Sequence, residues 1–242
     1  MRIILSFILI VSSLFAQSQQ VGKIDFDQIK RNITDKKSQY YYPLLIKRIL
    51  ANDSSLTHKD YKHLYYGSVF QDYYHPYGDS YVKKEFSEFY QSGNNKEIIE
   101  KGILVLKENP VDIEVTLKVL LAYLDEGDTA MTRIYGKKYY SFLDVIYASG
   151  DGESIETAYV VISVSDEYRI VGDLNLSVKQ QYLIEDVDLL IFVKKGQRRI
   201  RGKKIKQLYF NVHMPLMSLS NSFKDVEFPE PDPDPDGDDD DE

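Results

Sequence analysis

The spacing of apolar residues changes once along this chain of 242 residues. Before Ser149-Gly-Asp-Gly152, apolar side chains recur at the period of a helix face, and after it they form short runs typical of strands. Two glycines flanking an aspartate interrupt regular structure, so we expect a boundary there. The sequence therefore predicts an α+β fold, with a helical subdomain over residues 24–149 packed on a small antiparallel β subdomain over residues 153–215.

Capping residues divide the helical subdomain into hairpins. Thr57 and Asp60 have the spacing of a capping box, and Asp112 and Asp128 stand where they can cap two later helices. Paired helices with short turns are faintly similar to tetratricopeptide repeats, whose spacing some residues fit and others do not. Those that fit are Pro110, Tyr123 and Gly127, and those that do not are Thr132 and Gly136.

Several short runs after the boundary have the composition of strands. Their short connections favour an antiparallel meander. Acid pairs stand at the expected strand ends, where we expect solvated carboxylates: Asp166 with Glu167, and Asp186 with Asp188. The predicted strands are residues 159–164, 168–171, 178–184, 187–193 and 205–212.

The two ends differ in composition from the rest of the chain. Residues 1–16 contain Arg2 and then an apolar run from Ile3 to Val11, a pattern typical of a secretory signal peptide and too short to span a membrane. Residues 227–242 contain ten acids and no base; removing these from the 38 acids leaves 28 against 30 Lys plus Arg. We therefore expect export to the periplasm or the extracellular space, a nearly neutral body and a disordered acidic tail.

Several chemistries lack support in the sequence. The chain contains no cysteine, which excludes disulfides, a thiol nucleophile and thiolate-bound metal. Serine-hydrolase, P-loop and dinucleotide-binding motifs are absent, and the histidines do not have the spacing of zinc ligands on a helix. We therefore expect no cofactor and favour a non-enzymatic function. The histidines are His58, His63, His75 and His213.

Seven tyrosines fall in the 21 residues from position 61 to position 81. Tyrosine combines a large apolar ring with a polar tip, so it packs at the edge of a core or forms a recognition surface. Tyr61, Leu64 and Tyr65 share one helical face and are predicted to pack. A second group could form a surface that binds a sugar ring or a peptide; the alternative is that it packs on neighbouring helices. The candidates are His63, Tyr66, Tyr74, Pro76 and Tyr77.

A basic run occupies residues 194–206, with eight Lys or Arg in thirteen residues. It is predicted to lie at the tip of a β-hairpin, where it could contact an anionic membrane surface. The alternatives are a solvated loop and an electrostatic contact with the acidic tail. Export argues against a nucleic-acid partner. The residues assigned to surface contact are Lys194, Lys195, Arg198, Arg199, Arg201, Lys203 and Lys204.

Alternating aspartates in the tail are similar to the start of a calcium-binding loop. The chain ends one residue before the position of the bidentate glutamate, and two prolines stiffen the segment. We therefore expect weak calcium binding at most. The aspartates concerned are Asp232, Asp234, Asp236 and Asp238.

Several segments carry a resemblance to a known family. They are Tyr40-Tyr-Tyr-Pro-Leu-Leu-Ile-Lys-Arg48, the run from Asp60 through His-Leu-Tyr-Tyr to Gly67, Tyr74-x-Pro-Tyr77, Asp166-Glu-Tyr168 and Leu208-Tyr-Phe-Asn-Val212. Over about residues 24–215, the sequence resembles domain of unknown function family 4919, and Asn211 stands where that family has an aspartate. The resemblance implies an exported protein of Bacteroidota with no assigned activity, and it supplies no catalytic residues.

These observations lead to one favoured function and one alternative. We expect an exported cell-envelope protein that binds or scaffolds without catalysis, with an envelope protein or a glycan as partner. The alternative is an envelope hydrolase or glycan-processing enzyme that uses the tyrosine-rich segment as its substrate platform. An enzyme of that kind needs a concave pocket where acids or histidines with shifted pKa values converge.

Overall fold

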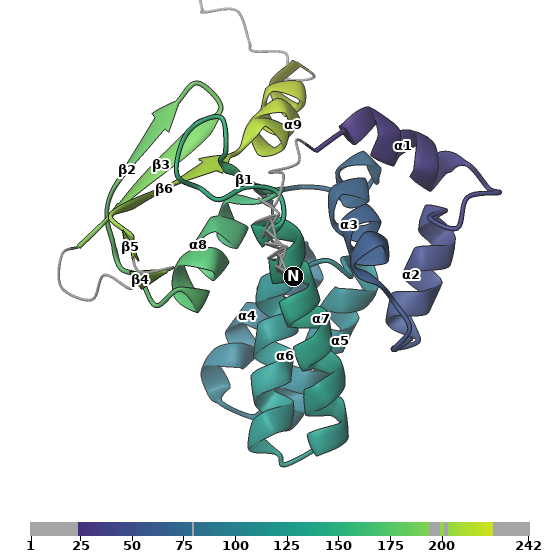
Figure 1. Ribbon diagram of the computed structural model, residues 1–242. Helices are drawn as coiled ribbons and strands as arrows, with labels where there is room; N and C mark the ends of the chain where they lie inside the picture. Colours follow the sequence, from purple (N-terminus) through teal and green to yellow (C-terminus); the bar gives the residue numbers. More distant parts are fainter. Residues whose placement is uncertain (1–23, 79, 194–198, 201–202, 225–242) are drawn as a thin grey trace, which may run out of the picture.

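The computed structural model describes residues 24–78, 80–193, 199–200 and 203–224. In this part of the chain, helices dominate the first two thirds and a small sheet lies in the last third (Figure 1). The α+β class is confirmed. None of the helices in the described ranges combines the length and hydrophobicity needed to cross a bilayer.

The helical part begins with three helices, α1 (Phe26–Thr34), α2 (Tyr42–Leu50) and α3 (His58–Gly67), and a single 3₁₀ turn (Ser68–Phe70) follows. The capping box at the start of α3 is confirmed, since the Thr57 side chain accepts from the backbone N–H of Asp60 and the Asp60 carboxylate accepts from that of Thr57. Residues 71–78 and Ser80 lie outside helices and strands and precede the remaining helices.

Four antiparallel helices form the bundle at the centre of Figure 1. They are α4 (Tyr81–Ser92), α5 (Asn95–Glu108), α6 (Ile113–Asp125) and α7 (Thr129–Tyr147). Asp112 and Asp128 cap α6 and α7 as predicted, through bonds from Val115 N at 2.9 Å and Met131 N at 3.0 Å. Gly127 joins these two helices at φ +75°, a conformation that favours glycine.

The main sheet has the strand order β1-β6-β3-β2, and a separate two-stranded ladder pairs β4 with β5. The antiparallel prediction holds for β2–β3 and β3–β6, but β1 is parallel to β6, so the sheet is mixed. In Figure 1, helix α8 lies below the main sheet and helix α9 lies at its upper right. The elements are β1 (Tyr159–Val160), α8 (Val164–Asp173), β2 (Val178–Ile184), β3 (Val187–Phe192), β4 (Arg199–Ile200), β5 (Lys203–Lys204), β6 (Gln207–Asn211) and α9 (His213–Lys224).

Two predictions in the last third were wrong. The predicted strand at 168–171 is part of α8, which Ser163 caps and whose Ile170 and Val171 face the core at helical spacing. The strand expected at 159–164 is only two residues long, because the chain turns into α8. Helix α9 follows β6 and continues past residue 215, and the bounds of the β subdomain stay a prediction.

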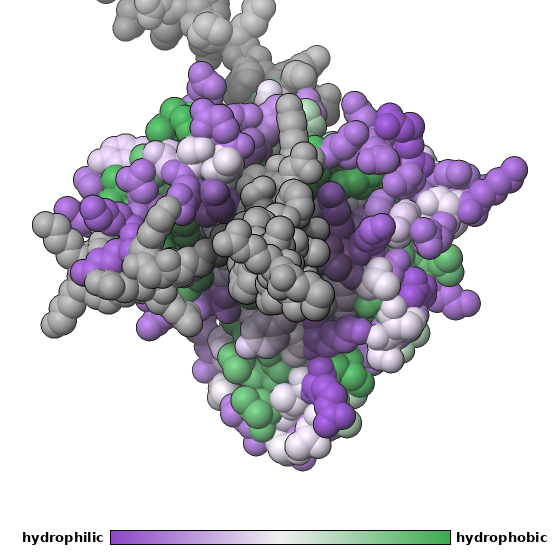
Figure 2. All heavy atoms as spheres, in the orientation of Figure 1, coloured by the Kyte–Doolittle hydropathy of each residue, from purple (hydrophilic) through white to green (hydrophobic). Residues whose placement is uncertain are grey.

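One continuous core joins the helical and strand-rich parts. It contains fully buried residues from both, including Tyr65 and Phe142 from the helices and Leu190 and Phe210 from the sheet. Figure 2 shows hydrophilic side chains over most of the visible face and hydrophobic ones near the far end of the α6–α7 hairpin, the region of the exposed Leu124. Shared burial of this kind fixes α3, α7 and α8 relative to one another.

Candidate functional site: a pocket between the helical bundle and α8

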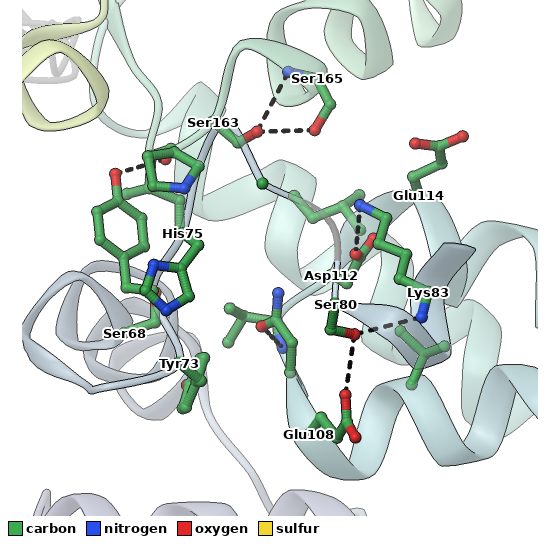
Figure 3. Close-up of a pocket in the computed structure, with 18 of the residues that line it drawn as sticks. Ser68, Tyr73, His75, Ser80, Lys83, Glu108, Asp112, Glu114, Ser163 and Ser165 are labelled. Atoms are coloured by element: carbon green, nitrogen blue, oxygen red, sulfur yellow. Dashed lines mark hydrogen bonds and ion pairs between the residues drawn. The ribbon is translucent and has the colours of Figure 1, made fainter. Parts of the chain in front are cut away.

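A concave pocket of about 930 Å³ lies where three segments meet. Residues 73–78 and Ser80 form one wall, the α5–α6 corner from Glu108 to Glu114 forms the second, and residues 162–166 at the start of α8 form the third (Figure 3). Its volume falls within the range of about 300 to 1,000 Å³ that is typical of small-molecule sites.

The amino ends of three helices point toward this pocket, and each is capped by a pocket-lining side chain. Ser80 accepts from Lys83 N at 3.2 Å in α4, Asp112 caps α6, and Ser163 accepts from Ser165 N at 3.3 Å in α8. Capping satisfies backbone N–H groups that would otherwise lack partners and places short polar side chains on the pocket wall.

The tyrosine-bearing loop is fixed on one side and open on the other. The Tyr74 hydroxyl donates to the carbonyl oxygen of Ile162 at 2.7 Å, which ties the loop to the segment before α8. Tyr77 also lines the pocket but is 48% exposed. Tyr74 therefore anchors the wall, whereas the Tyr77 ring can contact a ligand.

Paired charges line the bundle side of the pocket. The ammonium group of Lys83 lies 3.0 Å from a carboxylate oxygen of Asp112, and the Ser80 hydroxyl donates to Glu108 at 2.9 Å. Burial alone would raise the pKa of Glu114, but the hydrogen bond and charge of Lys118 lower it below its ordinary value. This wall therefore places donors beside acceptors with most charges compensated (Figure 3).

Asp166 contributes a buried acid to the wall opposite. It is 5% exposed, and its carboxylate accepts from the Tyr65 hydroxyl at 2.7 Å. Burial raises the pKa of Asp166 to about 7, with a further contribution from the negative charge of Asp112, while the Tyr65 hydrogen bond acts in the opposite direction. Asp166 therefore exchanges a proton near neutral pH.

Two further buried acids, Glu167 and Asp188, form a pair on the sheet side of α8. Glu167 is 0% exposed, and among the described residues neither of its carboxyl oxygens has a hydrogen-bond partner. Burial and then the charge of Asp188 raise the pKa of Glu167 to about 9. A contact between two carboxyl groups becomes a hydrogen bond only when one carries a proton, so protonated Glu167 can donate to Asp188. Gln181 donates to Asp188 at 2.8 Å from the other side.

Tyr77 connects this acid pair to the pocket. Burial raises the pKa of its hydroxyl, and the negative charges of Asp188 and Glu167 raise it further. The expectation of solvated carboxylates was wrong for Asp166, Glu167 and Asp188. Asp166 and Glu167 lie in the first turn of α8 and Asp188 lies on β3, and all three are buried.

The structure separates the residues that the sequence grouped into one binding surface. Tyr74, Pro76 and Tyr77 line the pocket, but His63 and Tyr66 do not. Tyr66 is fully buried and its hydroxyl donates to Val160 O at 3.0 Å. We therefore correct its predicted position: Tyr66 is a core residue and not part of a binding surface.

His63 is likewise a packing residue. Its Nδ1 donates to Lys59 O at 2.7 Å, its Nε2 accepts from Asn32 at 3.0 Å, and its ring stacks on Tyr40 at 3.8 Å between centroids. Burial lowers the pKa of His63, in keeping with a neutral ring. His63 and Tyr66 lie in the interior because other elements pack against the faces of α3 that carry them.

Sequence reasoning missed the charged residues of the pocket. Asp112 was recognised only as a cap and Asp166 only as a member of an acid pair, while Lys83 and Glu108 carry no local signal. Among the described residues, no group of three or more His, Asp or Glu side chains could hold a metal ion. The tail aspartates Asp232, Asp234, Asp236 and Asp238, and most of the basic run, lie outside the described residues.

The fold and the pocket define an α+β protein with a preformed site of mixed polarity between a helical bundle and a helix-covered sheet. The family model described as "Domain of unknown function (DUF4919)" matches residues 27–220, so the chain belongs to that family, as the tyrosine-rich segments indicated. No curated protein and no solved structure matches the chain.

Proposed function

We propose that this protein is exported to the cell envelope and binds a ligand non-covalently in the pocket between α4, α6 and α8. The apolar run with Arg2 in residues 1–16 supports export. The concave shape of the site favours a ligand that enters a pocket over a scaffold that presents a flat face to a protein.

The observation that carries this proposal is the half-exposed Tyr77 ring on the wall of a pocket in which neighbouring side chains are held by hydrogen bonds. Tyr74 is anchored by its hydroxyl, and Ser80 and Asp112 are anchored as helix caps. A site with fixed walls loses little conformational freedom when it binds, so more of the contact energy appears as affinity.

A variant that fills the pocket tests the proposal. Gly78 lines the pocket, is exposed, and a Cβ there would meet only His75 at an ordinary 3.6 Å. Gly78→Trp should therefore obstruct the pocket without strain. Gly172→Trp is the matched control, since Gly172 is exposed on α8, does not line the pocket and has no neighbour within 4 Å of its Cβ position.

Wild-type protein and both variants would be incubated with a low-molecular-weight extract of the envelope and measured by native mass spectrometry. We expect a bound mass on wild type and on Gly172→Trp that is absent on Gly78→Trp. Equal occupancy of all three proteins would refute ligand binding in this pocket. Export is tested separately by fractionation, where recovery of the protein in the cytoplasm alone would contradict it.

A second candidate function is hydrolysis of an envelope glycan. Asp166 favours it, because this pocket acid has its pKa raised to about 7 and lies near a second carboxylate, Asp112. A carboxylic acid of that pKa can donate a proton to a leaving group at neutral pH. Asp166→Asn should then abolish cleavage of a glycan while preserving its binding; cleavage that survives this substitution would remove Asp166 from the mechanism.

A further inference from the structure

We propose that the ligand of this pocket is a neutral oligosaccharide, an inference that rests on the proposed binding function. The site offers three features that suit such a ligand: a nearly compensated charge, alternating donors and acceptors, and an accessible aromatic ring.

Charge compensation disfavours a strongly charged ligand. Lys83 neutralises Asp112 at 3.0 Å, and Lys118 neutralises Glu114 at 2.9 Å. Asp166 is partly protonated at neutral pH, which leaves Glu108 as the main uncompensated charge. An anionic ligand would meet the carboxylates of the wall, and a polycation would have to displace ammonium groups already paired with them.

The Lys83–Asp112 pair matches the hydrogen-bonding pattern of a hydroxyl group. A hydroxyl donates one hydrogen and accepts through its lone pairs, so it can donate to Asp112 and accept from Lys83 at the same time. On the same wall, Ser80 donates its one hydroxyl hydrogen to Glu108 at 2.9 Å, so this pair offers the remaining lone pairs of the Glu108 carboxylate as acceptors. The two pairs lie close together (Figure 3), so neighbouring hydroxyls on a sugar ring can be satisfied together.

The Tyr77 ring supplies the apolar part of the site. A pyranose ring has a face of C–H groups that packs against an aromatic face, and Tyr77 is 48% exposed on the pocket wall. The hydroxyl end of Tyr77 lies near the Glu167–Asp188 acid pair, which holds that end of the ring in a polar setting. The pocket volume of about 930 Å³ accommodates more than one sugar ring.

The test uses four neutral tetrasaccharides as probes: cellotetraose, maltotetraose, mannotetraose and N-acetylchitotetraose. Binding to the purified protein is measured by saturation-transfer NMR and titration calorimetry. We expect at least one probe to bind, with affinity about tenfold weaker in Tyr77→Ala, since the variant loses the stacking face. Tyr77→Phe keeps that face and should bind like wild type.

Two further variants separate recognition from folding. Tyr81→Ala removes a tyrosine that is 81% exposed and does not line the pocket, so it should leave binding unchanged. Asp112→Asn retains a good helix cap but removes the carboxylate that pairs with Lys83, so it should weaken sugar binding while circular dichroism shows the wild-type fold.

The outcomes distinguish the inference from the proposed function on which it rests. One outcome is that none of the four sugars binds, whereas a cationic tripeptide such as trilysine binds to wild type and not to Tyr77→Ala. This outcome would refute the saccharide ligand and support the pocket as a binding site. Sugar binding that is insensitive to both Tyr77→Ala and Asp112→Asn would overturn the assignment to this site. Absence of binding by every probe, together with equal native masses for Gly78→Trp and wild type, would overturn both proposals.

Discussion

Replacing Glu167 with glutamine should stabilise this protein at neutral and alkaline pH. The Glu167 carboxyl is completely buried beside Asp188, and among the described residues its oxygens have no hydrogen-bond partner. Glutamine has nearly the same shape, cannot ionise, and offers an N–H donor to the Asp188 carboxylate. The substitution therefore removes the titration while keeping the volume.

The magnitude follows from the pKa of Glu167, which changes from 4.5 in the unfolded chain to about 9 in the fold. Between these values the folded protein binds more protons than the unfolded chain, so the free energy of unfolding falls as pH rises, by about 1.4 kcal/mol per pH unit. At pH 7 the accumulated loss is about 3 kcal/mol. Glu167→Gln should recover most of that amount at pH 7 and almost none near pH 4.5.

Urea denaturation at pH 5 and pH 8 measures this effect. Wild type, Glu167→Gln and the control Glu100→Gln, which changes an exposed acid on α5, would be compared. We expect the advantage of Glu167→Gln over wild type to grow by several kcal/mol between the two pH values, while the control follows wild type. An advantage that is the same at both pH values would show that ionisation of Glu167 does not destabilise the fold, as would a control that behaves like Glu167→Gln.

Three further predictions concern the loop, the bundle and the tail. Tyr74→Phe should lower the free energy of unfolding by about 1 kcal/mol in urea denaturation, because it loses the partly buried hydrogen bond to Ile162, whereas Tyr77→Ala should leave it nearly unchanged; equal losses would contradict the assigned roles. Gly102→Ala should cost about 1 to 3 kcal/mol in the same assay, because its Cβ would overlap Val119 Cγ2, and a neutral effect would show that α5 and α6 can separate. Deleting residues 227–242 should raise binding to anionic vesicles at low salt in a sedimentation assay, since the chain loses ten acids, and unchanged binding would exclude an electrostatic contact between the tail and the basic run.

The helical half of the fold could be predicted because its signals are local. Thr57, Asp112 and Asp128 satisfy backbone N–H groups within their own first helical turns, so their sequence context is sufficient. The prediction of a strand at 168–171 was wrong because the β-branched and aromatic residues of this segment favour strands. In the fold, the Ser163 cap and the packing of α8 stabilise a helix instead.

The candidate site could be predicted only in part, because it is assembled from distant segments. Tyr74, Pro76 and Tyr77 are adjacent in sequence and were found together. Lys83 and Asp166 are far apart in sequence, and their approach depends on how α4 and α8 pack, which no local pattern encodes. The interior positions of His63 and Tyr66 likewise follow from neighbours that only the folded chain supplies.

Ligand binding in the pocket beside Tyr77 is tested most directly by NMR chemical-shift mapping of the protein during titration with an oligosaccharide that binds. We expect shifts concentrated at Tyr77, Lys83, Asp112 and the first turn of α8, with few changes at α1 or β2. Shifts concentrated on β2 or α9, with Tyr77 and Lys83 unaffected, would contradict binding in this pocket.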